Sequence, residues 1–139
     1  MAKSIILSLS HIMQNILSHN RRPDLTFHKS GRIDISSRVV GLLILHPGDV
    51  ISIAKERDGF FLYIVARKEE IPAHFSYSGR CFSANKSASS LRTQSCRLCN
   101  EILRASRREN VVKLPVGDVV ETPIGRAVPI ITQNALNYD

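Results

Sequence analysis

Residues 29–66 carry the pattern that most constrains the fold of this chain. Residues 32–35 alternate polar with apolar side chains, which is typical of a strand with one buried face. We expect residues 25–28 to begin this strand, which then continues through a bend. Two serines follow it and can cap a helix, and the apolar cluster at 39–43 predicts about two helical turns. A proline–glycine–aspartate run at 47–49 predicts a turn.

Asp58 and Gly59 are the strongest hairpin signal in the sequence, because a tight primed turn needs positive φ angles. They separate a predicted strand at 50–56 from a predicted return strand at 60–66. The return strand is largely apolar. We therefore expect it to be covered on both faces, either by the rest of the chain or by a second subunit.

A looser copy of this unit follows in the second half. Residues 81–90 begin as a strand and become a small, polar loop, and 93–106 predict a helix with Thr93 as its N-cap. The two halves can be aligned in sequence, with Ser37 opposite Cys96 and Gly48 opposite Gly117. We predict an α+β fold in which two β-α-β-β-like repeats form a pseudo-two-fold barrel or packed sheets. Chance similarity between two small α+β units is the alternative.

The predicted organisation places an N-terminal amphipathic helix at 1–22, a first unit at 23–66, a connector at 67–80 and a second unit at 81–134, with both units in one compact domain. The helix follows from an apolar stripe of isoleucine and leucine at 5, 9, 12 and 16. Docking of this helix on its own domain is the simpler expectation. A homodimer formed through the helix or through a hairpin edge is the alternative.

Composition narrows the classes of protein that this chain can belong to. No apolar run approaches the ~20 residues of a membrane span, and polar residues interrupt the only candidate signal segment. Three cysteines, an odd number, argue against a disulfide framework. We therefore expect a cytoplasmic protein without a membrane partner.

The net charge of +7 is concentrated in one part of the sequence. Residues 80–113 hold eight basic and two acidic residues, which is about +6, while 114–139 come out near −2. Such an excess favours a polyanionic partner, most often nucleic acid. A basic surface kept for solubility is the alternative explanation.

The sequence contains no constellation of residues that indicates an enzyme. Cys96 and Cys99 have the spacing of a metal or redox motif, but a structural zinc ion needs four ligands and no second pair exists. Two buried apolar thiols on a helix face are the simpler interpretation. The histidines are scattered, and glycine-rich phosphate loops are absent. We therefore predict no catalysis, no metal and no cofactor.

The runs SGRIDIS, VVGLL, LHPGDVISI and DGFFLYIV together resemble the AbrB-type swapped-hairpin DNA-binding domain, a family that includes MazE-like antitoxins. The resemblance covers about 40 of 139 residues, and its most specific part is the Leu-x-Pro-Gly-Asp run at 45–49. It implies two interlocked units whose basic strand and loop residues meet DNA. By position it implies Arg32 and Arg38 as contacts, with Lys29 beside them.

Three hypotheses about function follow. The first is a DNA-binding transcriptional regulator, with DNA favoured over RNA, whose phosphate contacts are Lys29, Arg32, Arg38, Lys86, Arg92, Arg97, Arg104, Arg107 and Arg108. The second is a single-stranded nucleic-acid-binding protein that stacks bases on Phe75, Tyr77 and Phe82. Rings of this kind more often fix a loop to the core. The third is a non-enzymatic protein–protein interaction module that uses the helix at 5–17.

Overall fold

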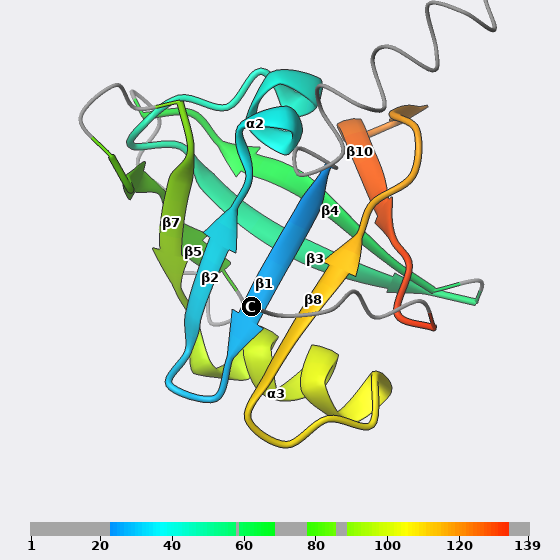
Figure 1. Cartoon of the computed structure of the whole chain (residues 1–139). Coiled ribbons are helices and arrows are strands. Elements are labelled where there is room, and N and C mark those ends of the chain that lie inside the picture. The colour runs from blue at the N-terminus through cyan, green and yellow to red at the C-terminus, as the bar shows by residue number, and fades with distance from the viewer. Residues whose placement is uncertain (1–22, 58, 69–77, 86–88, 134–139) are drawn as a thin grey trace, which may run out of the picture.

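The computed structural model describes residues 23–57, 59–68, 78–85 and 89–133 (Figure 1). The predicted N-terminal helix lies outside these residues, as does most of the predicted connector. The described chain is α+β, with two antiparallel five-stranded sheets and two helices. Its strands form two open sheets, so of the two predicted arrangements the packed sheets are observed and the closed barrel is not. Among the described helices, none is long and apolar enough to cross a bilayer.

Sheet A is our name for the sheet with the strand order β6-β7-β2-β1-β8. Its strands are β1 (Asp24–His28), β2 (Arg32–Ile35), β6 (Phe82–Ser83), β7 (Leu91–Gln94) and β8 (Val111–Pro115). Side chains alternate between a buried inner face and a largely polar outer face, as the pleat requires.

Sheet B has the order β5-β3-β4-β10-β9. Its strands are β3 (Val50–Glu56), β4 (Gly59–Ala66), β5 (Ser78–Arg80), β9 (Val120–Thr122) and β10 (Gly125–Ile130). The inner faces of both sheets contribute to one apolar core, whose members include Phe27, Ile33 and Leu114 from sheet A and Ile51, Leu62 and Val128 from sheet B.

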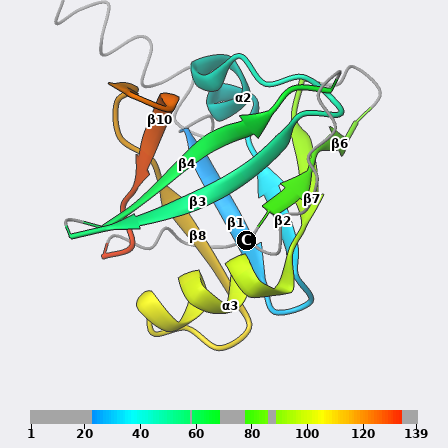
Figure 2. The same cartoon turned by 180° about the vertical axis from the view of Figure 1, so that it is seen from behind.

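The two helices lie at opposite ends of sheet A (Figures 1 and 2). Helix α2 (Ser37–Leu43) follows β2, and α3 (Cys96–Ala105) follows β7. Because β2 and β7 are antiparallel neighbours, their C-terminal ends lie at opposite ends of the sheet, and the helices that follow them start from those opposite ends. Each helix closes one end of the core, α2 with Val39 and Leu43 and α3 with an apolar face that includes Ile102.

The pairing of β2 with β7 has the symmetry of a local two-fold axis. Both strands are followed by a serine and then a helix, and the serines, Ser36 and Ser95, stand 59 positions apart (95 − 36). Every antiparallel pair has such an axis, so the register alone carries no information about a duplication. What the two halves share here is the order of a strand, a serine and a helix.

The first half matches the predicted elements with two differences. The strand at 50–56 and the hairpin are confirmed, although Gly59 pairs with Glu56 and therefore begins the return strand instead of lying in the predicted turn. Residues 25–28 do not continue into the next strand. They form β1, and the chain reverses at Gly31, whose φ of 99° suits glycine, so that Leu25 faces Ile35 in an antiparallel hairpin.

In the second half, the predicted helix at 93–106 begins later than expected. Ser95, not Thr93, is the N-cap, and its hydroxyl accepts a hydrogen bond from the Leu98 N–H at 3.3 Å. Thr93 belongs to β7, is fully buried, and donates its hydroxyl to the Arg80 carbonyl at 2.9 Å. The strand was missed because both residues can cap a helix, and only the pairing of β7 with β2 decides between them.

The predicted turn at 47–49 is fixed by a buried carboxylate. Asp49 is 1% exposed, and its Oδ2 accepts hydrogen bonds from the His46 N–H at 2.8 Å and from Arg67 Nη1 at 2.7 Å. Arg67 Nη1 also donates to the carbonyl of Ile44 at 2.8 Å, a residue with a left-handed φ of 54°. The ion pair thus holds α2, the turn and the end of β4 together.

Replacing Asp49 with alanine should lower the free energy of unfolding by about 2 kcal/mol, because the turn loses the carboxylate that accepts hydrogen bonds from the His46 N–H and from Arg67, whose exposed guanidinium is then hydrated. Urea denaturation measures this difference. The aligned aspartate of the second half, Asp118, is exposed, so Asp118→Ala is the matched control and should change stability by less than about 0.5 kcal/mol. Equal effects at both positions would contradict this assignment.

Candidate nucleic-acid interface

One row of side chains crosses the whole outer face of sheet A. Residues directly opposite each other in antiparallel strands point to the same face. The strand registers therefore align one residue from each of the five strands in the order Phe82, Arg92, Asp34, Thr26 and Lys113. The row places an aromatic ring at one edge, a cation at the other, and a second cation beside a carboxylate between them.

Asp34 is the centre of an ion cluster on this face. Its carboxylate lies 2.9 Å from Arg92 Nε, 2.8 Å from His28 Nε2 and 3.3 Å from Arg32 Nε. At 2.8 Å from a carboxylate, His28 Nε2 must carry a proton and donate it. That ring nitrogen then has no free lone pair. Arg32 Nη2, 3.2 Å away, therefore cannot donate a hydrogen bond to it. Arg32 Nε is buried and, within the described chain, lacks a hydrogen bond of good geometry.

These neighbours determine the ionisation of Asp34. Burial raises the pKa of its carboxyl, but the hydrogen bonds from His28 and Arg92 and the charge of Arg32 outweigh burial, so the pKa is lowered. Asp24, on the same face, behaves in the opposite way. Burial raises the pKa of its carboxyl, and the charge of Lys113, 3.9 Å away, lowers it by less. The pKa of Asp24 is therefore raised. The outer face of sheet A therefore carries three cations that are largely balanced by two carboxylates.

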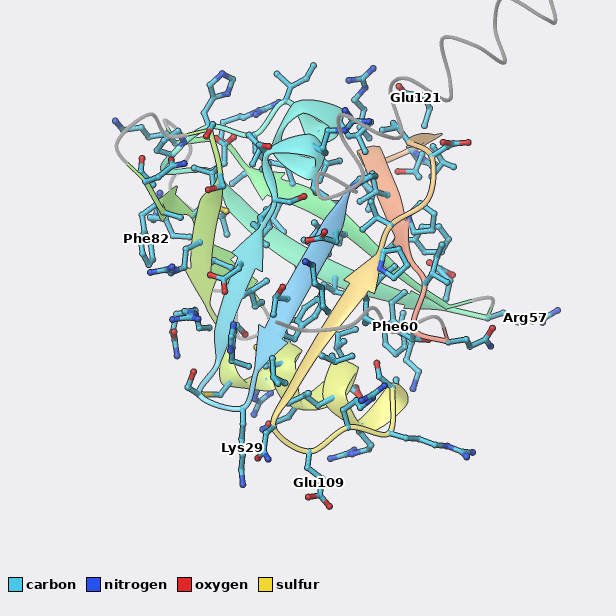
Figure 3. The ribbon with its side chains drawn as sticks, viewed as in Figure 1. Lys29, Arg57, Phe60, Phe82, Glu109 and Glu121 are labelled. Atoms are coloured by element: carbon cyan, nitrogen blue, oxygen red, sulfur yellow. The ribbon has the colours of Figure 1, made fainter. Side chains whose placement is uncertain are left out.

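A second group of cations lies at the end of the molecule formed by α3. We call Lys29, Arg97, Arg104, Arg107 and Arg108 the α3-end cluster; all five are exposed. The Lys29 N–H donates to the Asn110 carbonyl at 2.7 Å, which joins the β1–β2 turn to the segment after α3. Figure 3 shows Lys29 and Glu109 extending from this same end.

Most of the α3-end cluster has no acidic partner. Among the described residues, no carboxylate oxygen lies within 4.0 Å of a side-chain nitrogen of Lys29, Arg104, Arg107 or Arg108. Cations are also favoured at the C-terminal end of a helix by its dipole, typically by 0.3–1 kcal/mol each. The dipole accounts for the residues near the end of α3. It does not account for Lys29, which comes from another turn, or for Arg97 in the first turn of α3.

Arg107 has an unfavourable backbone conformation at the end of α3. Its φ is 58°, its N–H donates to the Arg104 carbonyl at 3.1 Å, and the Arg108 N–H donates to the Leu103 carbonyl at 2.9 Å. This is a Schellman motif, in which the left-handed position is usually a glycine. A side chain with a β-carbon costs roughly 1–2 kcal/mol in that conformation. The chain therefore keeps a charged residue here at some cost in stability.

The structure separates the remaining predicted contacts. Arg32 and Arg92 lie on the outer face of sheet A and share Asp34, while Arg38 lies in the first turn of α2 at the opposite end from the α3-end cluster. Phe82, on β6, is 50% exposed and faces outward beside Arg92. The predicted contacts Lys86, Phe75 and Tyr77 lie outside the described residues.

Sequence reasoning missed three members of the outer face, namely His28, Asp34 and Lys113. The alternation in 24–28 and 111–115 would have placed His28 and Lys113 on the polar face of their strands. The alternation in 32–35 would also have placed Asp34 on the polar face of its strand. The ion pair of Asp34 with Arg92 could not be predicted, because it depends on the register between strands far apart in the sequence.

The cysteine pair does not form a two-thiol site. Cys99 is fully buried, as predicted, but Cys96 is exposed, so the expectation of two buried thiols is wrong for Cys96. Burial raises the pKa of the Cys99 thiol to about 11, and burial with the nearby Asp49 raises that of Cys81 to about 12. Within the described ranges, no three histidine, cysteine, aspartate or glutamate side chains gather to hold a metal ion.

No protein-family model, curated protein or solved structure matches the chain. The chemistry of the described side chains is therefore the basis for assigning a function.

The pKa shifts of Asp34 and Asp24 are opposite in direction, so replacing each with asparagine should change stability in opposite directions. Asp34→Asn should lower the free energy of unfolding at pH 7 by about 1 kcal/mol. Because the pKa of Asp34 is lowered by folding, its contribution is present above the unfolded value near 3.8 and is lost as the pH falls through the folded value. The difference between wild type and Asp34→Asn should therefore vanish in acid.

Asp24→Asn is the matched control for this experiment. Folding raises the pKa of Asp24, so its ionised form costs stability, and the substitution should leave stability unchanged or raise it at neutral pH. Urea denaturation of both variants from pH 7 to pH 2 compares them, because the contribution of Asp34 is lost only below the unfolded value near 3.8, as the pH falls through the lowered folded value. Two results would show that the ion cluster does not act as described. One is an equal loss of stability in Asp34→Asn and Asp24→Asn, and the other is a loss of stability in Asp34→Asn that persists in acid.

Proposed function

We propose that this chain is a non-enzymatic nucleic-acid-binding protein, a cytoplasmic DNA-binding transcriptional regulator, which meets the phosphate backbone with the α3-end cluster. The observation that carries the proposal is the convergence of five exposed cations from two distant segments on one end of the molecule. Nearly all non-specific affinity for DNA, and much of the specific affinity, comes from such contacts to phosphates.

The electrostatics of the two surfaces favour the α3 end over sheet A as the first contact. Arg32 and Arg92 already interact with Asp34, and Lys113 lies near Asp24. A phosphate approaching sheet A must compete with these carboxylates. At the α3 end, four of the five cations have no such competitor among the described residues, so a phosphate there meets a field that is not already balanced.

The left-handed Arg107 adds a second line of support. Glycine would fit this position of the Schellman motif with less strain, and it would remove the charge. Ile44 stands in the same position of a second Schellman motif, at the end of α2, so the strain itself is not specific to the α3 end. What distinguishes Arg107 is that the side chain kept in this position is charged, and a phosphate contact would use that charge.

The resemblance to the AbrB-type domain and the internal duplication are part of the same proposal. Support for a duplication comes from the common order of a strand, a serine at the N-cap position and a helix in each half. Of the residues that the resemblance implies, Lys29 belongs to the α3-end cluster and Arg32 lies on β2 near the same turn. Arg38 lies at the other end, so one DNA segment lying across the α3 end does not include it.

A single-stranded ligand on sheet A is the second candidate, favoured by one observation. Phe82 is half exposed and directly opposite Arg92 on the outer face, so a ring and a guanidinium are presented side by side. Base stacking on such a ring contributes about 1–3 kcal/mol, and arginine adds a contact to the phosphate or the base. Against it, Asp34 holds Arg92 at 2.9 Å.

The phosphate contacts can be tested by measuring duplex DNA affinity as a function of salt. The logarithm of the binding constant should fall linearly with the logarithm of salt concentration, and the slope should decrease by about 0.9 for each lost contact. Arg107→Gly is the sharpest variant. It should weaken DNA binding while leaving stability unchanged or raising it by up to about 1 kcal/mol, so unfolding cannot explain the loss.

Arg126→Ala is the matched control, because Arg126 is an exposed arginine on sheet B that contacts Glu121 and the Leu42 carbonyl. It should leave the slope unchanged, whereas Arg108→Ala should lower it as Arg107→Gly does. Binding that does not weaken as salt rises, or equal losses in Arg126→Ala and Arg107→Gly, would rule out the α3 end as the phosphate contact.

Phe82 separates the two candidates. If bases stack on sheet A, Phe82→Ala should weaken binding of a single-stranded oligonucleotide by about 1–3 kcal/mol, while Phe82→Tyr should retain it, because only the second variant keeps a ring. Duplex binding through the α3 end should be the same in both variants. Mobility-shift titrations with duplex DNA, single-stranded DNA and RNA give all three affinities. Indifference of every ligand to Phe82→Ala would remove the second candidate.

A further inference from the structure

The outer face of sheet B is apolar, in contrast to that of sheet A. The registers align Tyr63 on β4 with Ala127 on β10 and Val120 on β9, and they place Phe61 beside Ala54 in the next row. In Figure 2, β3 and β4 of this sheet face the viewer. Val120 is 38% exposed, and Ile124, in the turn before β10, is 60% exposed. Apolar residues that gather in this way on a surface usually mark an interaction site.

The face is also hollowed. A cavity of about 500 Å³ lies between the β3–β4 hairpin and the β9–β10 turn, and its walls include Phe61, Tyr63, Ile124 and, on the rim, Glu56. Its volume is within the range of pockets that enclose a ligand or several side chains. Except for Glu56 and Thr122, its walls offer little to a polar partner, so its occupant should present an apolar surface.

The chain itself contains an apolar surface without an assigned position. The sequence of 1–22 predicts a helix with an isoleucine and leucine stripe at 5, 9, 12 and 16. Such a stripe must be buried against something, because packing of the apolar face provides most of the stability of a helix in a protein. The same segment contains Lys3, Arg21 and Arg22 and no acidic residue. Glu56, the one carboxylate among the described walls of the hollow, therefore meets no like charge there, although Lys55 and Arg57 flank it in the sequence.

The described chain begins near β10, one of the strands of sheet B. The Pro23 carbonyl accepts a hydrogen bond from the Val116 N–H at 3.0 Å, and the next residue, Gly117, donates to the Pro129 carbonyl at 2.9 Å. Pro129 lies opposite Phe61, which lines the cavity. A helix at 5–17 is ~20 Å long, and β4 has eight residues or ~27 Å, so the helix fits along the strand. Residues 18–22 reach up to ~17 Å, enough to connect it to Pro23.

We propose that residues 5–17 dock as an amphipathic helix on the outer face of sheet B of the same chain, with the apolar stripe in the hollow beside Phe61, Tyr63 and Ile124. This helix covers the second face of β4, whose apolar sequence requires a cover on both sides. The inference does not depend on the proposed function, because sheet B and the α3-end cluster are separate surfaces.

The absence of tryptophan from the sequence allows a direct test in the full chain. In Ile12→Trp, the single indole belongs to the apolar stripe. It should show blue-shifted emission and strong protection from acrylamide quenching under native conditions. Ile124→Asp, made in the same background at an exposed turn position, puts a charge in the hollow and should shift the emission to the red. Val120→Asp should act in the same way. Phe82→Asp is the matched control on sheet A and should leave the emission unchanged.

Light scattering of Ile12→Trp determines which chain supplies the helix. A monomer mass with protected emission that Ile124→Asp and Val120→Asp both abolish supports docking within one chain. Solvent-like emission of native Ile12→Trp overturns the proposal, as does protected emission that neither sheet B variant alters. A dimer mass with protection that is lost on dilution also overturns it, because the face is then covered by a second copy.

Discussion

The antiparallel pairing of β2 with β7 is the interaction on which the rest of the structure depends. It is the only contact between described strands that joins the serine–helix unit of the first half directly to that of the second. It directs α2 and α3 to opposite ends, brings Thr93 into the core and places Arg92 beside Asp34. Without this register, the positions of both helices and the ion cluster on sheet A are undefined.

The same pairing divides the basic residues into two electrostatic classes. Cations on sheet A face carboxylates on neighbouring strands, because alternation and register place Asp34 next to Arg92 and Arg32. Cations after α3 are attached to a helix end, where the neighbouring groups are backbone carbonyls already used in the Schellman motif. A count of charges along the sequence treats all of them alike. Their contribution to binding an external anion differs, because only the second class is not already paired within the described chain.

Local signals were sufficient for part of the fold. Asp58-Gly59 with its flanking apolar runs predicted the β3–β4 hairpin, and the two serines before the apolar cluster marked the start of α2. The expected side-chain cap is not made, because the Ser36 hydroxyl accepts a hydrogen bond from the Asp24 N–H at 3.1 Å instead. The cap of α3 could not be chosen locally, since Thr93 and Ser95 are both competent and a distant strand decides. For the candidate site, the charge run pointed to α3, which carries two members of the α3-end cluster and precedes two more. That Lys29 joins it, and that Arg38 does not, follows from how the β1–β2 turn contacts Asn110, which no local pattern contains.

The two glycine–aspartate turns differ in the contacts that hold them. Around Asp49, the backbone of 46–49 also exchanges hydrogen bonds with Cys81, so that turn ties together three separate parts of the chain. Asp118 occupies the aligned place and is exposed, although the two residues before it, Val116 and Gly117, donate to the Pro23 and Pro129 carbonyls. Extra residues inserted after Asp118 leave those hydrogen bonds in place and displace few contacts. This loop is therefore the natural attachment point for a tag, a fluorophore or a fused domain, while the loop at 46–49 has to keep its length.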